Sequence, residues 1–293
     1  MANTAEVPGV ITGIDGSDSA TGAARWAADL AARCGIPLTL VHAVSPLNWY
    51  FAGAESIPTR TADSSGNAAL TAANAAAREA HPDLVVTTVS AKGTVASVLA
   101  KASESARLLV VGSGSADHRT LGAHAVRILH SAQVPVVVWR QPVAVRNGDP
   151  LPVVVGVDDS AAAARAIAQA FEIAASLQAP VMVAHMWELD AAVGMGDLGG
   201  SGNMDWQLFD VLQSQQRQHL EELVAPLAQK YPNAHISKVF RDTSPTRGLT
   251  ALSRQAQLVV VGSRGHGRVA TALIGSVCQN LIHHAECPVL VVQ

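Results

Sequence analysis

The chain has 293 residues, enough for two ordinary domains that each bury a core of their own. Its charged residues make up only 15%, its net charge is −3, and no Lys/Arg cluster is present, which argues against nucleic acid as a partner. No leader-like start or membrane-length apolar run appears and the three cysteines lack metal-ligand spacing, so we expect a cytoplasmic protein without a membrane segment or metal site.

Short apolar runs alternate with longer amphipathic runs through the first half of the chain. Ser17 or Asp18 is suited to cap the first amphipathic run, and Gly35 ends it. The predicted strands lie near 9–14, 37–44, 83–90, 107–112 and 134–139, and the predicted helices near 18–34, 61–80, 93–105 and 122–132.

The second half repeats this order of elements. Gly148, Pro150 and Pro152 interrupt regular structure, so a linker is predicted at 141–151, between domains at 1–140 and 152–293. The predicted strands lie near 152–157, 180–187, 234–241, 257–262 and 287–292, and the predicted helices near 160–177, 205–230, 244–255 and 275–285.

Self-comparison shows that the halves are copies of one domain. The segment at 10–15 (VITGID) returns as VVVGVD at 153–158, and the segment at 108–113 (LLVVGS) returns as LVVVGS at 258–263. The displacement rises from 143 to 150 residues between these two pairs, which places the length changes in loops. Such self-similarity indicates tandem copies of a single fold.

The alternation of strands and helices predicts an α/β fold, in two tandem copies of an open five-stranded parallel sheet with helices on both faces. Ligands of such sheets bind at the carboxyl ends of the strands, where the strand order reverses. Asp15 and Asp158 end the first strand of each copy and therefore lie at that edge.

The stretch at 257–276 (QLVVVGSRGHGRVATALIGS) carries the strongest functional signal. Its apolar start does not alternate, as in a strand buried on both faces, and a glycine loop leads to Gly275-Ser276 at the start of a helix. Loop amides and the orphan donors of a helix's first turn can hold one anion, which the helix dipole favours. Three basic side chains lie in the loop: Arg264, His266 and Arg268. A phosphate is the predicted ligand, and a simple glycine-rich turn is the alternative.

Other phosphate motifs do not fit this loop. It lacks the lysine of a Walker A motif, and a Rossmann G-x-G-x-x-G would follow the first strand rather than the fourth. Rapid phosphoryl transfer therefore lacks its usual residues. Asp158 can accept from a ribose hydroxyl or an adenine amino group, or it can cap the helix that starts near Ser160, and both interpretations stand.

The histidines have no catalytic pattern around them. His42 and His185 occupy matching strand ends, and His130 and His283 occupy matching helices, so core packing or capping is the prediction for all four. No nucleophile elbow or Ser-His-Asp order is present, and no catalytic residue is predicted.

The spacing Gly262-x2-Gly265-x9-Gly275-Ser276, followed by Cys287-Pro288 and a valine-rich strand, resembles the universal stress protein family. The likeness covers both copies and is strongest to tandem-domain mycobacterial-type members. It implies a Rossmann-like fold of the adenine-nucleotide α-hydrolase type, with ATP as ligand, with or without Mg²⁺.

The resemblance also implies the binding residues. In the second copy these are Gly156, Asp158, Met186, Val261, Gly262, Ser263, Arg264, Gly265, His266, Gly267, Arg268, Gly275, Ser276 and Val277. In the first copy they are Gly13, Asp15, Ala43, Val111, Gly112, Ser115, Gly122, Ala123 and His124.

The first copy departs from the family pattern in its loop. Six residues rather than nine separate Ser115 from Gly122, Ser115 replaces a glycine, and Ala123 replaces a hydroxyl residue. We therefore expect its nucleotide site to be weaker or empty. The family's last strands commonly pair, so 134–139 and 288–292 are expected to pair within this chain, and a homodimer is expected in addition.

The resulting hypothesis is a nucleotide-dependent stress-response module. Its rivals are a slow ATPase or nucleotidyl transferase, a cyclic AMP-binding protein, and a ligand-free dimerisation scaffold.

Overall fold

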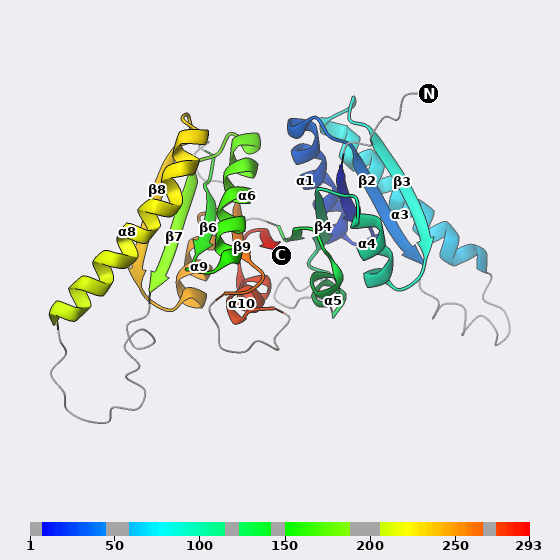
Figure 1. Ribbon diagram of the computed structural model, residues 1–293. Coiled ribbons are helices and arrows are strands. Elements are labelled where there is room, and N and C mark those ends of the chain that lie inside the picture. The colour runs from blue at the N-terminus through cyan, green and yellow to red at the C-terminus, as the bar shows by residue number, and fades with distance from the viewer. Residues whose placement is uncertain (1–7, 45–58, 115–122, 142–149, 188–205, 266–273) are drawn as a thin grey trace. The chain divides into compact units, whose positions relative to one another are not determined.

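The computed structural model describes residues 8–44, 59–114, 123–141, 150–187, 206–265 and 274–293. The chain divides into two compact units, one of residues 1–143 with 282–293 and one of residues 144–281. Each unit is an α/β structure in which helices cover a sheet (Figure 1). The second copy's last residues therefore belong to the first unit.

The first unit contains a mostly parallel sheet. Its strands are β1 (Val10–Gly13), β2 (Leu38–Val44), β3 (Val86–Lys92), β4 (Leu108–Gly112), β5 (Val136–Trp139) and β10 (Val289–Val292). The order is β3-β2-β1-β4-β5-β10, and all neighbours are parallel except β5 and β10. The direction of strand order reverses between β1 and β4.

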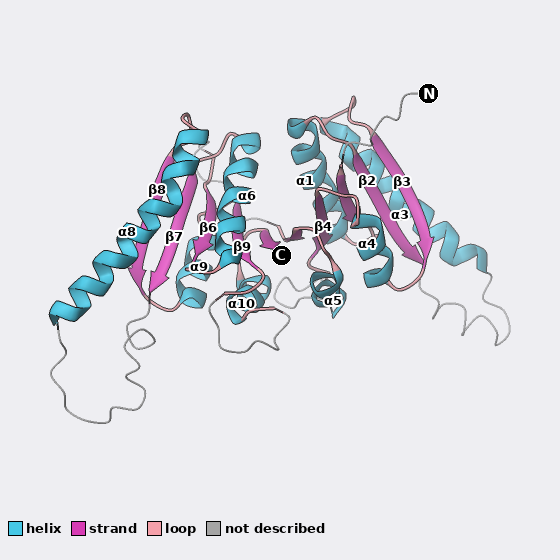
Figure 2. Ribbon diagram, in the orientation of Figure 1, coloured by secondary structure: helices cyan, strands magenta, loops and turns pink. Residues whose placement is uncertain are grey.

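Helices cover this sheet (Figure 2). They are α1 (Asp18–Cys34), α3 (Thr59–Ala80), α4 (Val95–Ser103) and α5 (Ala123–Ser131). Helix α1 contacts α3, and α4 contacts α5. The buried side of α1 is a stripe of alanines, which lets the helix lie close to the strands.

Local signals position the first helix. The Ser17 side chain accepts from the Ala20 amide and caps α1, as one of the two predicted caps. Gly35 ends the helix with a φ of 64°, and its amide donates to the carbonyls of Ala31 and Ala32. The side chain of Asp15 in turn accepts from the Ser17 amide at 2.9 Å, so this aspartate holds the cap residue.

The second unit repeats the architecture. Its strands are β6 (Val153–Val157), β7 (Val181–Trp187), β8 (Ile236–Asp242) and β9 (Leu258–Gly262), in the parallel order β9-β6-β7-β8. The helices are α6 (Ala161–Leu177), α8 (Trp206–Lys230), α9 (Pro245–Ser253) and α10 (Ser276–His284). Four of the five β9 residues are buried, as its unbroken apolar run predicted.

The largest difference from a predicted boundary lies at the start of β3. A strand was expected near 83–90, but β3 begins at Val86. The Leu84 amide donates to the His81 carbonyl at 3.1 Å, which closes a turn across Pro82 and Asp83. Proline favours such a turn, so the strand starts only after it.

The final strands of the two copies pair with each other, as the resemblance predicted. Strands β5 and β10 run antiparallel, with Val136 opposite Val291 and Val138 opposite Val289. This pairing covers an edge of each strand that would otherwise present unpaired backbone groups.

A buried arginine reinforces this pairing. Arg140, directly after β5, is only 5% exposed. Its Nη1 donates to the carbonyl of Ala285 at 2.8 Å and to that of His283 at 3.4 Å, and its Nη2 donates to the Ile282 carbonyl. A helix leaves its last carbonyls without partners, and its dipole favours a cation there. Burial lowers the pKa of Arg140, but arginine starts so far above neutrality that it stays charged.

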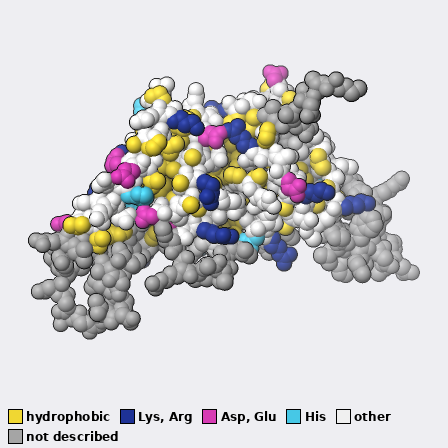
Figure 3. Space-filling model, viewed as in Figure 1, with side chains coloured by type: hydrophobic (Ala, Val, Ile, Leu, Met, Phe, Trp, Pro, Cys, Tyr) yellow, Lys and Arg dark blue, Asp and Glu magenta, His cyan; other side chains and the backbone are white. Residues whose placement is uncertain are grey.

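The surface is mixed in character. On the face drawn in Figure 3, charged side chains of both signs are interspersed among neutral and apolar ones. No helix in the described ranges has the length and apolarity needed to cross a bilayer.

Candidate nucleotide-binding site

A cavity of about 690 Å³ lies in the second unit at the carboxyl ends of β6 and β9, where the strand order reverses. The starts of α9 and α10 complete its wall. Ten of the predicted site residues line it: Gly156, Asp158, Met186, Val261, Gly262, Arg264, Gly265, Gly275, Ser276 and Val277. The fold thus brings together residues that lie more than a hundred positions apart in the chain.

Asp158 supports the start of α6 and also lines the cavity. Its Oδ1 accepts from the amide and the hydroxyl of Ser160. Ser160 is the N-cap of α6 and accepts from the Ala163 amide at 3.2 Å. Asp158 therefore positions the cap while it also lines the cavity.

The glycine loop rests on this aspartate. A Cβ atom built at Gly265 would lie 2.4 Å from Oδ2 of Asp158, a distance that real side chains do not tolerate. The absence of a side chain at position 265 is therefore what allows the loop to lie against the carboxylate. Asp158 and the loop form one connected part of the cavity wall.

Gly275 closes the other end of the loop. Its amide donates to the carbonyl of Ser263 at 2.8 Å, so the buried Ser263 supports the start of α10 without lining the cavity. A Cβ atom at Gly275 would meet nothing closer than the Ser263 oxygen at 3.5 Å, and its φ lies outside the range that demands glycine. A Cβ atom there would therefore make ordinary van der Waals contacts with the backbone of the glycine loop.

The cavity has an apolar side and a polar side. Ala184, Leu249 and Val261 contribute apolar surface, while Asp158 and Arg264 contribute opposite charges. Cys278 also lines the cavity, and burial raises the pKa of its thiol to about 12, so it stays neutral at physiological pH. Among the described residues, no group of three or more His, Cys, Asp or Glu is arranged to hold a metal ion.

The side chain of Met186 packs against Gly248 in α9. A Cβ atom at Gly248 would lie 2.4 Å from the Met186 sulfur, so the thioether occupies the space that a larger residue would fill. In the first copy the matching positions hold Ala43 and Val98. The strand residue is therefore smaller and the helix residue larger than in the second copy.

Sequence reasoning missed the contribution of α9. Pro245 and Leu249 line the cavity, as do Cys278 and Gln279 in the first turns of α10. The repeat held a signal, because Leu249 matches Leu99, which lines the first unit's cavity. Three predicted residues, His266, Gly267 and Arg268, lie outside the described residues.

The family model for universal stress proteins matches residues 9–140 and again residues 151–293. The chain belongs to the universal stress protein family. A universal stress protein of Mycobacterium tuberculosis strain H37Rv is 36% identical over 97% of this chain and 95% of its own length. One of Mycolicibacterium smegmatis is 30% identical over 100% of this chain and 99% of its own. The predicted resemblance to tandem mycobacterial members is therefore confirmed.

Solved universal stress proteins share the fold. A universal stress protein from Archaeoglobus fulgidus superposes with a TM-score of 0.68 at 18% sequence identity. The match covers 97% of this chain and 98% of the Archaeoglobus chain. A likeness at this identity concerns the architecture alone, and it supports the α/β assignment.

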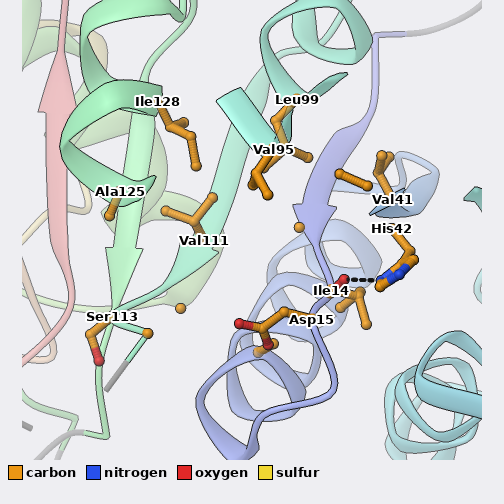
Figure 4. A pocket seen from close by; sticks show the side chains of 15 residues that line it. Ile14, Asp15, Val41, His42, Val95, Leu99, Val111, Ser113, Ala125 and Ile128 are labelled. Atoms are coloured by element: carbon orange, nitrogen blue, oxygen red, sulfur yellow. Dashed lines mark hydrogen bonds between the residues drawn. The ribbon is translucent and has the colours of Figure 1, made fainter. Parts of the chain in front are cut away.

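The first universal stress protein repeat has a smaller cavity, of about 240 Å³, at the carboxyl ends of β1 and β4 (Figure 4). Five predicted residues line it: Gly13, Asp15, Ala43, Val111 and Gly112. Ala123 and His124 begin α5, whereas Ser115 and Gly122 lie outside the described residues.

The strand-end histidines support the structure in both universal stress protein repeats. Nδ1 of His42 lies 2.7 Å from the Ile14 carbonyl oxygen, and Nδ1 of His185 lies 3.0 Å from that of Val157. Each histidine thus joins the second strand of its repeat to the residue directly before Asp15 or Asp158. The predicted packing or capping role is confirmed for these two residues.

Proposed function

We propose that the second repeat binds an adenine nucleotide, with ATP as the ligand. The observation that carries the proposal is Gly275, which lines the cavity directly before the N-terminus of α10. A helix N-terminus attracts an anion through its amides and its dipole, and a glycine there allows a phosphate to approach the backbone.

The phosphate end of the ligand would lie at the first turn of α10. The Gly275 amide is engaged by Ser263, which leaves the amides of Ser276 and Val277 as donors from that turn. Arg264 lines the same cavity and supplies positive charge. ATP carries its own Mg²⁺ through its phosphates, so the chain need not provide a metal site.

The adenosine end would lie against the strand ends. Asp158 can accept from a ribose hydroxyl or the adenine amino group, and Leu249 and Val261 offer apolar surface to the ring. The cavity volume of about 690 Å³ falls within the range of about 300–1,000 Å³ that small-molecule sites occupy.

We infer a regulatory role in the cytoplasm rather than rapid catalysis. ATP would bind preferentially to one arrangement of the loop and shift the population toward it, which changes the surface offered to partners, including a second copy of the chain. Rapid cleavage usually uses a lysine at the phosphates, and the described residues that line the cavity include no lysine.

The test is to identify the nucleotide that leaves the natively purified protein, by mass spectrometry, and to titrate ATP into the emptied protein by calorimetry. Gly275→Ala should weaken ATP binding about tenfold, because a Cβ there stands between α10 and the glycine loop. Thermal unfolding should change little, since that Cβ meets only ordinary contacts.

Gly122→Ala changes the matching residue of the first repeat and serves as the control, with ATP affinity unchanged. Equal ATP affinity in wild type and Gly275→Ala would contradict the proposal. If the wild type releases ADP linearly with time and Gly275→Ala does not, the protein is an enzyme instead. If cyclic AMP binds more tightly than ATP, cyclic AMP is the ligand instead.

The pair Met186 and Gly248 gives a second prediction. Gly248→Val should push the Met186 side chain toward the cavity and weaken ATP binding roughly five- to tenfold, the cost of about 1 kcal/mol of overpacking. The double variant Met186→Ala with Gly248→Val reproduces the pair found in the first repeat and should restore most of the affinity. Calorimetry of the four proteins completes a double-mutant cycle, and additive effects would show that the two residues act independently.

A further inference from the structure

Helix α8 packs less closely on its neighbours than α3, the matching helix of the first repeat. Helix α3 makes close backbone contacts with α1, β2 and β3, whereas the described part of α8 makes few, chiefly with α6. The Phe240 ring of β8 stacks on His185 at 5.5 Å between centroids, and Arg217 of α8 lies 4.7 Å over the same ring. In the described part of α8 the buried side chains are Leu220 and Val224. Few apolar contacts therefore hold α8 in place, and its polar contacts with the rest of the unit carry more weight.

A polar pair joins α8 to the turn that precedes α6. Nε2 of His219 lies 3.1 Å from Oδ1 of Asp159, and this nitrogen is shielded from solvent. An Nε2–H group, which is present in the charged ring and in one neutral tautomer, is attracted to the carboxylate. Asp159 lies between Asp158, which lines the cavity, and Ser160, the N-cap of α6. Helix α8 thus holds the turn that carries Asp158.

The first repeat meets the same turn in a different way. Gly16 stands at the position of Asp159. Ala69 stands at the position of His219. Gly16 has a φ of 87°, and a Cβ atom built on it would lie 3.4 Å from the Cβ of Ala69. Helix α3 therefore reaches its turn by close approach of two small residues, whereas α8 reaches its turn through a longer polar contact.

A second histidine fixes this turn in both repeats. Nδ1 of His185 lies 3.0 Å from the Val157 carbonyl oxygen, and the side chain is only 7% exposed. His42 makes the matching contact in the first repeat. This support is common to the two repeats, so His219 is the support that the second repeat adds.

We propose that His219 is a positioning residue for the nucleotide site of the second repeat, and that it couples ATP binding to the packing of α8. The inference rests on the proposed function of that repeat. Coupling of this kind is reciprocal, because a contact that favours the binding arrangement of Asp158 is itself favoured when ATP binds. The side chains of His219 and Asp159 are 39% and 44% exposed, so the expected contribution is modest. Nucleotide occupancy would thus alter the packing of one helix at the protein surface.

The experiment compares His219→Leu with His219→Gln by calorimetry with ATP. Leucine cannot donate to Asp159, so ATP affinity should fall about three- to fivefold. Glutamine keeps an N–H donor at a similar reach and should retain affinity within about twofold. Inorganic triphosphate lacks the nucleoside that Asp158 would contact, so its affinity should be the same in both variants and the wild type. Gln218→Leu changes an exposed residue of the same helix and is the control, with ATP affinity unchanged.

Amide hydrogen exchange tests the coupling directly. Without nucleotide, the first turn of α6 should exchange faster in His219→Leu than in the wild type, and ATP should slow exchange in α8 more in the wild type than in the variant. Equal ATP affinity in the wild type and His219→Leu, triphosphate affinity that falls as far as ATP affinity, or unchanged exchange would overturn the inference. If ATP does not bind the wild type, the proposed function fails, and exchange in the nucleotide-free proteins still decides whether His219 holds the turn.

Discussion

Replacing Arg140 with alanine should lower the free energy of unfolding of the first unit by about 3 kcal/mol. The guanidinium is buried and donates to the carbonyls of Ile282, His283 and Ala285 at the end of α10. Without it, these carbonyls lose a charged donor in a place that water does not readily reach, and each hydrogen bond to a charged group contributes about 1.5–3 kcal/mol. Urea unfolding followed by circular dichroism measures the loss.

Gln293 offers the matched control. It occupies the place after β10 that Arg140 occupies after β5, and its Nε2 donates to the Leu129 carbonyl of α5 at 3.1 Å. Gln293→Ala removes the neutral hydrogen bond to the Leu129 carbonyl and should cost about 1 kcal/mol. If both variants lost the same free energy of unfolding, the charge of Arg140 and its several carbonyl partners would contribute nothing extra to stability.

Gly265→Val should weaken ATP binding by roughly 30- to 100-fold. The new Cβ would lie 2.4 Å from Oδ2 of Asp158, so either the carboxylate or the glycine loop must move. Moving them disturbs the nucleoside contact and the phosphate cradle together, a loss of about 2–3 kcal/mol. Calorimetry with ATP measures the effect.

The control is Ser115→Val, the matching change in the first repeat, which should leave ATP affinity unchanged. Asp158→Asn keeps the shape of the side chain and removes its charge. This variant therefore tests the nucleoside contact separately from the phosphate cradle. If Gly265→Val binds ATP as well as the wild type, the loop does not hold the phosphates and the assignment of the site is wrong.

The course of the chain was predictable because its signals are local. The short apolar runs, the amphipathic runs and the repeat reveal the strands and helices. Some boundaries differ, such as the start of β3, which the turn at Pro82 moved. The spacing of Gly262, Gly265 and Gly275 likewise marks the loop. Asp158 remained ambiguous because a cap and a ligand contact use the same carboxylate, and the structure shows the cap while the ligand contact stays a prediction.

By itself, the sequence determined that this protein is a doubled α/β domain of the universal stress protein family, with a glycine loop after the fourth strand of its second copy. Tertiary structure alone decided that Arg140 caps a helix more than 140 residues away, that Gly248 makes room for Met186, and that the two cavities differ about threefold in volume. The reason is physical. Local patterns record how each segment satisfies its own backbone and buries one face, whereas these contacts depend on which side chains meet after the segments have packed, and no periodicity encodes that meeting.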